Sequence, residues 1–118
     1  MAKDKETGIK GEQIAENFLL NKGYTILHKN WRWQRKEIDI IARYEGFLIF
    51  VEVKTRYSFD FGFPEEAVSL LKQQHMKTAA EAFAEDYTDF ESIRFDIISI
   101  LIKQGAAQEI MHFEDAFY

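Results

Sequence analysis

The chain has 118 residues, 47% of them hydrophobic and 15% aromatic, which suits a single domain with a core of its own. It has no cysteine, which excludes disulfides and thiolate metal sites and fits a reducing cytoplasm. A formal charge of −5 weighs against general nucleic-acid binding, and no apolar run is as long as a signal segment or a membrane span. We therefore expect a soluble cytoplasmic protein with no membrane partner.

The first periodic segment, residues 8–22, predicts an amphipathic helix with one apolar face. Thr7 is placed to cap its start, and Gly23 to end it. Glu12 lies at the border of the apolar face, from which a carboxylate can reach the rim of a sheet and ligate a metal ion directly or through water. Taken alone, Glu12 is better explained as a solvated acid in the first turn of the helix.

Three strands are predicted next, over residues 24–31, 37–44 and 47–54. In the second strand Ile38 and Ile40 mark one face and Asp39 the other. The third strand is apolar until it ends in Glu52-Val53-Lys54, and a doubly buried strand needs a special reason to carry such charges. A hairpin through residues 44–46 would let Asp39 and Glu52 converge.

The second half of the chain predicts an aromatic loop over residues 57–63, a long helix that starts at Pro64, and strands over 92–102 and 109–113. The expected buried stripe of this helix is Val68, Leu71, His75, Ala79 and Phe83. The order α-β-β-β-α-β-β predicts an α/β fold with a mixed central sheet flanked by helices, as one domain over residues 1–118.

The acids and the lysine near the sheet centre predict a metal site. The carboxylates of Asp39 and Glu52, with the carbonyl of Val53 between them, are the hard oxygen ligands that Mg²⁺ or Mn²⁺ prefers. Lys54 points to the same side of its strand as Glu52, and could hold a water molecule or neutralise charge on a phosphate oxygen. Without the lysine, this set of residues would indicate only a metal site.

Positive charge gathers between Asn17 and Lys36, a stretch with no acid and with two interleaved tryptophans. Such a patch can dock a phosphate backbone, although a solvated basic hairpin explains it equally well. The candidate nucleic-acid contacts are Lys29, Arg32, Arg35, Lys36, Arg56 and Lys72. The nearby aromatic residues could stack on unpaired bases or fill a dimer interface: Trp31, Trp33, Tyr57, Phe59 and Phe61.

Several blocks of the sequence resemble the YraN-like family of small uncharacterised bacterial proteins. They are Gly11-Glu12, residues 37–41, 50–56 and 61–68, Arg94-Phe95-Asp96 and Asp115-Ala116-Phe117, and the resemblance extends over nearly the whole chain. This chain has Lys36 where the family usually has glycine before Glu-Ile-Asp.

That family in turn is similar to the restriction-endonuclease-like, or PD-(D/E)xK, nucleases, and among them to archaeal Holliday junction resolvases. The resemblance implies that Glu12, Asp39, Glu52 and Lys54 form a metal-dependent phosphodiesterase site, and that a polar residue of the second helix, best represented by Lys72, supports it. It also implies DNA as substrate, including branched DNA, and a homodimer for symmetric cutting of a junction. A protein that binds nucleic acid or another partner without catalysis is the alternative, and Asp96 could serve either the site or a structural pair with Arg94.

Overall fold

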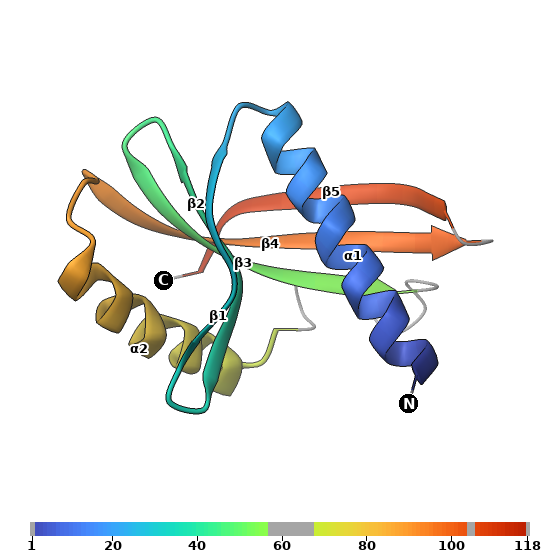
Figure 1. The fold of residues 1–118 in the computed structure, drawn as a ribbon, viewed down its shortest axis with the longest axis horizontal. Helices are drawn as coiled ribbons and strands as arrows, with labels where there is room; N and C mark the ends of the chain where they lie inside the picture. The colour runs from blue at the N-terminus through green and yellow to red at the C-terminus, as the bar shows by residue number, and fades with distance from the viewer. Residues whose placement is uncertain (1, 57–67, 104–105, 118) are drawn as a thin grey trace.

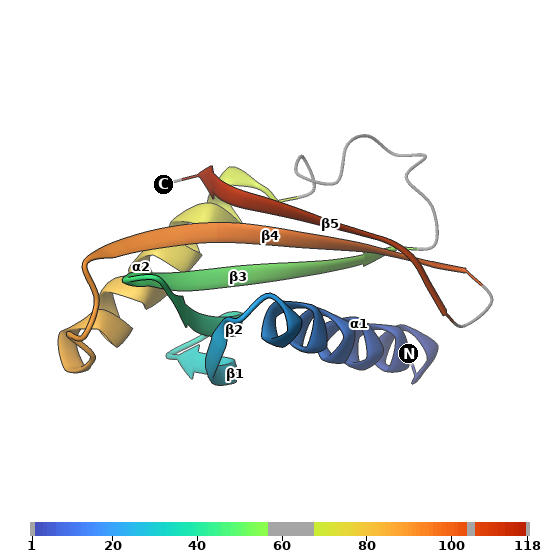
Figure 2. The ribbon, with the colours of Figure 1, turned by 90° about the horizontal axis from the view of Figure 1, so that it is seen from above.

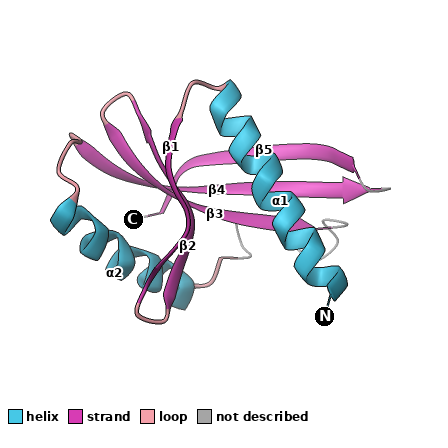
Figure 3. Ribbon diagram, viewed as in Figure 1, coloured by secondary structure: helices cyan, strands magenta, loops and turns pink. Residues whose placement is uncertain are grey.

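The structure is a computed structural model, and it describes residues 2–56, 68–103 and 106–117. Its elements are α1 (Ala2–Asn21), β1 (Thr25–Trp33), β2 (Lys36–Tyr44), β3 (Phe47–Arg56), α2 (Leu70–Asp86), β4 (Ser92–Lys103) and β5 (Ala106–Phe117). The predicted order α-β-β-β-α-β-β and the α/β fold are confirmed (Figures 1 and 3). The expected aromatic loop over 57–63 and the helix start at Pro64 lie outside the described residues.

The five strands form one sheet in the order β1-β2-β3-β4-β5. Neighbouring strands are antiparallel except for β3 and β4, which are parallel and are joined through α2. The mixed central sheet is thereby confirmed, and β3, which carries Glu52 and Lys54, is its middle strand. Within the described residues, neither helix is both long and apolar enough to cross a membrane.

The two helices cover opposite faces of the sheet (Figure 2). Ala15 and Leu19 of α1 pack on one face, and Met76, Ala79 and Phe83 of α2 on the other. Burying a large apolar side chain contributes about 1.5–3 kcal/mol, so these two layers hold the sheet between the helices. The strand residues on the α1 side include Ile40, Ala42, Ile49, Val51, Ile98 and Ile100, and those on the α2 side Ile38, Ile41, Leu48, Phe50 and Phe95.

Helix α1 begins earlier than predicted and ends where expected. It starts at Ala2, so the expected N-cap at Thr7 is wrong; the alanine and charged residues before Thr7 have high helix propensity and continue the helix. At the other end Gly23 has φ 92° and its N–H donates to Leu20 O, while the N–H of Tyr24 donates to Leu19 O. These two bonds form a Schellman motif, which confirms Gly23 as the stop.

Helix α2 begins at Leu70, where Ser69 is the N-cap and its hydroxyl accepts from the N–H of Lys72 at 3.1 Å. Val68, Ala79 and Phe83 are buried as predicted, although the helix starts later than expected and Val68 precedes it, so the predicted stripe is partly wrong. Leu71 is 67% exposed and His75 is only half-buried. The buried face is instead Met76, Ala79, Ala80 and Phe83, which have helical spacing.

The hairpin of β2 and β3 turns through Glu45 and Gly46, both with positive φ, as a type I′ turn requires. The two strands pair from Tyr44 and Phe47 as far as Ile40 and Val51. Beyond that point Ile38 packs on the α2 side although Ile40 packs on the α1 side, so the expectation that both share a face is wrong. Strand β2 therefore changes face at Asp39.

Candidate active site

Asp39 lies where β2 leaves β3. The last paired residues on this side of the hairpin are Ile40 and Val51, and the next polar contact is made by a side chain. Oδ2 of Asp39 accepts a hydrogen bond from the N–H of Val53 at 2.8 Å. The carboxylate thus takes the place of a backbone acceptor and is held against the segment that carries Glu52 and Lys54.

Glu52 is buried beside Asp39. It is 5% exposed and lies on the α2 side of β3, one residue from Val51, which faces α1. Burial, then the hydrogen bond with Asp39 and the charge of that residue, raise the pKa of Glu52 to about 8. Two carboxylates that share one buried position keep a proton at neutral pH unless a cation replaces it.

Lys72 joins the site from the first turn of α2. Its Nζ lies 3.6 Å from Oε2 of Glu52 and donates to the carbonyl of Glu37 at 3.3 Å. The ammonium group therefore bridges β2 and β3 where the two strands separate. Its positive charge opposes the rise in the Glu52 pKa. The sequence predicted Lys72 both as a nucleic-acid contact and as a residue of this helix that supports the site, and the structure places it against Glu52, a predicted metal ligand.

Lys54 and Val53 complete the β3 part of the site. Lys54 is half-buried, points to the same side of β3 as Glu52, and its charge lowers the Glu52 pKa. The N–H and C=O of one strand residue face the same neighbour, so the Val53 carbonyl also faces the side of Asp39. The predicted Asp39, Glu52, Val53 and Lys54 therefore lie together.

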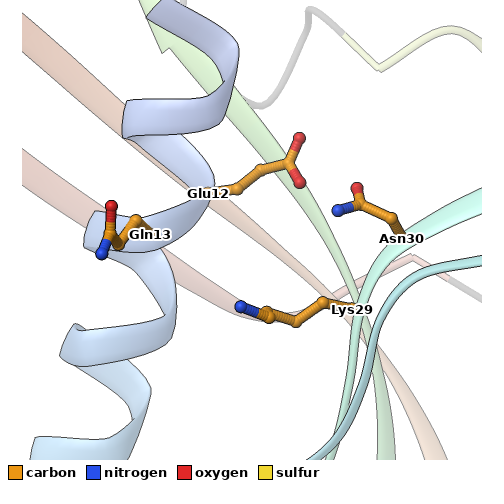
Figure 4. Close-up of a pocket in the computed structure, with 4 residues that line it drawn as sticks. All are labelled: Glu12, Gln13, Lys29 and Asn30. Carbon is orange, nitrogen blue, oxygen red and sulfur yellow. The ribbon is translucent and has the colours of Figure 1, made fainter. Parts of the chain in front are cut away.

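Glu12 approaches this group from α1. Gly11 is buried against Thr55 of β3 so closely that a Cβ would collide with the Thr55 side chain, and this contact brings α1 onto β3. Glu12 is half-buried and lines a pocket of about 260 Å³ with Gln13, Lys29 and Asn30 (Figure 4). Burial and the charge of Asp39 raise its pKa, so the two carboxylates are electrostatic neighbours.

The donor set fits a hard divalent cation. Asp39 and Glu52 supply two carboxylates and Val53 a carbonyl, all oxygen, and the proton that the acid pair keeps marks where positive charge is missing. In the described part of the chain, no three His, Cys, Asp or Glu side chains form one metal-binding group. Glu12 therefore stands apart from the Asp39–Glu52 pair, and water or substrate would complete the coordination.

Most predicted nucleic-acid contacts lie on β1 and β2, and several already have partners. Lys29 pairs with Glu16 of α1 at 3.1 Å, Arg32 lies 3.6 Å from Glu37, and Lys36 lies over the ring of Trp33. Arg35 is exposed at the β1–β2 turn, and Arg56 is half-buried at the end of β3. Lys72, in the first turn of α2, contacts the Glu37 carbonyl of β2 and the Glu52 carboxylate, so the start of α2 lies beside the acids of the candidate site.

The tryptophans differ in their surroundings. Trp31 packs edge to face on Phe83 of α2, with ring centroids 5.3 Å apart, and belongs to the α2-side core. Trp33 lies under Lys36. Tyr57, Phe59 and Phe61 lie outside the described residues. Packing in the core accounts for Trp31 without a bound base.

Asp96 belongs to a structural network rather than to the site. It is fully buried and accepts from Arg94 Nε and an Arg94 terminal nitrogen at 2.9 and 2.8 Å. His112 Nε2 lies 2.7 Å from the same carboxylate, and the His112 ring packs on Phe18 of α1. The network therefore lies on the α1 side of the sheet, and the interpretation of Asp96 as a partner of Arg94 is the one that the contacts support.

Asn30 is the site residue that sequence reasoning missed. Its side-chain amide points toward the Glu12 carboxylate, and both residues line the same pocket (Figure 4). One signal could have found it, since asparagine is depleted in strands and is enriched at left-handed backbone positions.

The sequence matches the profile of the uncharacterised protein family UPF0102 over residues 11–100. It is 47% identical to a UPF0102 protein of Flavobacterium psychrophilum over 119 residues, which cover 100% of this chain and 98% of that protein. It is 45% identical to one from Natranaerobius thermophilus, covering 97% of this chain and 98% of the relative. A relative from Rhodococcus opacus is 38% identical, with 99% and 100% covered.

Proposed function

This chain belongs to the uncharacterised protein family UPF0102, as its YraN-like sequence blocks predicted, and we propose that it is a metal-dependent endonuclease that hydrolyses phosphodiester bonds in DNA. The observation that carries the proposal is the contact of Asp39 with the backbone of Glu52-Val53-Lys54. This contact lies where β2 separates from β3. There the carboxylates of Asp39 and Glu52 lie near the ammonium groups of Lys54 and Lys72. Burying the Glu52 carboxylate beside that of Asp39 is unfavourable, and a bound metal ion would supply positive charge that offsets their repulsion.

Each residue of the site has a role that follows from its charge and its position. Asp39, Glu52 and the Val53 carbonyl would hold Mg²⁺ or Mn²⁺, which when bound polarises a phosphoryl oxygen and lowers the pKa of a coordinated water. Lys54 supplies a positive charge on the same side of β3, where negative charge develops on the phosphate. Lys72 holds the Glu52 carboxylate and the β2 backbone in register. Glu12 adds a carboxylate that can take up a proton or orient water.

The exposed cations on the β1–β2 hairpin would bind the DNA backbone. A net charge of −5 means that only this local patch favours phosphate, so binding is expected to be weak on plain duplex and to fall steeply with salt. Branched and otherwise structured DNAs are the substrates to test first. Symmetric cutting of two strands would require a homodimer.

Activity on a DNA panel tests the proposal. The purified protein is incubated with Mn²⁺ or Mg²⁺ and with duplex, flap and four-way DNA, beside Lys54→Met and Lys103→Met. Lys54→Met keeps the length of the side chain and is expected to lose at least about 100-fold in cleavage rate, whereas Lys103, an exposed residue at the end of β4, is a matched control.

The outcomes of this panel are distinct. Cleavage by the wild type and by Lys103→Met that Lys54→Met lacks would support the nuclease. Equal cleavage by all three would mean a contaminating enzyme. Binding of DNA without cleavage by any of them would favour the non-catalytic alternative, a protein that retains the site for binding only.

A further inference from the structure

Asn30 lies at the point where the β1–β2 hairpin bends. Lys29 pairs with Ile40 and Trp31 pairs with Ile38, which leaves Asn30 opposite Asp39. The backbone of Asn30 has φ 52°, in the left-handed region that few residues other than glycine adopt. The bend of β1 at Asn30 therefore lies opposite Asp39, where β2 changes face.

The side chain of Asn30 points across the pocket at Glu12. Figure 4 shows the amide of Asn30, from β1, and the carboxylate of Glu12, from α1, directed toward one another. Burial and the charge of Asp39 raise the pKa of Glu12, and the facing amide of Asn30 opposes that rise. Lys29, the next residue along β1, reaches toward α1 and pairs with Glu16, so the same segment contacts the helix twice.

We propose that Asn30 is a positioning residue of the catalytic centre, with a separate task for its backbone and its amide. The left-handed backbone sets the hairpin bend that directs Asp39 toward β3, and the amide orients the Glu12 carboxylate across the pocket between α1 and β1. This inference rests on the proposed nuclease function for its catalytic consequence. Asparagine suits both tasks, because it tolerates the left-handed region and carries a neutral donor.

Two substitutions separate the tasks. Asn30→Gly keeps the backbone free to adopt positive φ and removes only the amide. Asn30→Asp also tolerates positive φ but presents a third carboxylate to Glu12 and Asp39 in place of a donor. Gln34→Gly is the control, because Gln34 has φ 57° at the exposed hairpin turn and does not line the pocket.

The first readout needs neither metal nor DNA. The side-chain amide protons of Asn30 are followed by NMR in the wild type and in Glu12→Ala, and we expect Glu12→Ala to move both resonances and speed their exchange with water. Unchanged Asn30 amide resonances in Glu12→Ala would overturn the inference, even if the protein were an active nuclease.

The second readout is the cleavage rate with Mn²⁺. We expect kcat to fall about tenfold in Asn30→Gly and further in Asn30→Asp, with KM for DNA unchanged, while Gln34→Gly stays within about twofold of the wild type. Wild-type rates in Asn30→Gly would also overturn the inference. Should the wild type cleave none of the DNAs, the nuclease proposal fails, and the NMR comparison alone decides whether Asn30 holds Glu12.

Discussion

The N–H of Val53 donates to Oδ2 of Asp39 at 2.8 Å, where the pairing of β2 with β3 has already ended. One side chain thus satisfies a backbone donor and brings its carboxylate to Glu52. Structure and proposed chemistry depend on the same oxygen atom, and two substitutions of Asp39 can separate them.

Asp39→Asn is expected to remain folded and to lose at least about 100-fold in cleavage, because the amide oxygen still accepts from Val53 while the charge for the metal is gone. Asp39→Ala leaves the Val53 donor without its acceptor and should cost about 1–2 kcal/mol of stability as well. Thermal unfolding and cleavage assays of both variants test this. Equal stability of the two variants would contradict the structural part of the argument.

Metal binding should release a proton near neutral pH. The pKa of Glu52 is raised to about 8 by burial and by Asp39, so at pH 7 the acid pair keeps a proton that a divalent cation must displace. The apparent affinity for Mn²⁺ is expected to rise from pH 6 to 8 and to level off above it. Calorimetry at pH 7 in buffers of different ionisation enthalpy measures the released proton, and a buffer-independent heat would exclude it.

Without metal, the raised pKa of Glu52 makes the folded protein less stable as the pH rises. Because the folded pKa of Glu52 lies above its ordinary value of 4.5, the folded protein binds more protons than the unfolded chain between pH 4.5 and 8. Its contribution to stability is therefore lost as the pH rises through that window. Added Mn²⁺ should restore stability most at pH 8.

Much of this site could be predicted from sequence because its residues follow the two-residue alternation of a strand. Asp39, Glu52 and Lys54 needed only the hairpin at Glu45 and Gly46 to be brought together. The change of face at Asp39 could not be predicted in this way, because a strand pattern assumes regular alternation.

The helices show another limit of sequence patterns. The start of α2 at Ser69 depends on a local hydrogen bond from Lys72 to the Ser69 hydroxyl, and the proline and acids before it gave an equally good start signal. Asn30 escaped prediction because its role depends on how α1 packs against β1, and the pattern of a single helix or strand does not specify that packing.

The network around Asp96 should make the protein sensitive to acid. Burial alone would raise the pKa of Asp96, but hydrogen bonds from His112, Arg94 and the N–H of Asp115 lower it below its ordinary value of 3.8. A depressed folded pKa contributes stability that is present above pH 4 and is lost as the pH falls through the folded value. Asp96→Asn should cost about 3 kcal/mol at pH 7, since it leaves the largely buried Arg94 with only the more distant Glu114 carboxylate, 3.7 Å away, as a charged partner.

Urea unfolding of the wild type and Asp96→Asn between pH 7 and pH 3 measures this linkage. The difference in unfolding free energy should be constant above pH 5 and should narrow below pH 4. Asp89→Asn serves as the control, because Asp89 is an exposed acid that pairs with Arg43 at the surface. A difference that does not change with pH would mean that Asp96 acts through its shape and not through its charge.

Cations of the hairpin should contribute unequally to DNA binding. Arg35 is exposed at the turn, whereas Lys29 is held by Glu16 at 3.1 Å and must break that pair to reach a phosphate. Each phosphate contact changes the slope of log affinity against log salt by about 0.9. Arg35→Ala should therefore lower the magnitude of this salt slope by about 1. Lys29→Ala should change the slope much less. Glu16→Gln should strengthen DNA binding, because it frees Lys29 from its ion pair. Fluorescence anisotropy with labelled four-way DNA at 50–200 mM salt measures all three slopes, and an unchanged slope for Arg35→Ala would place the DNA away from the hairpin.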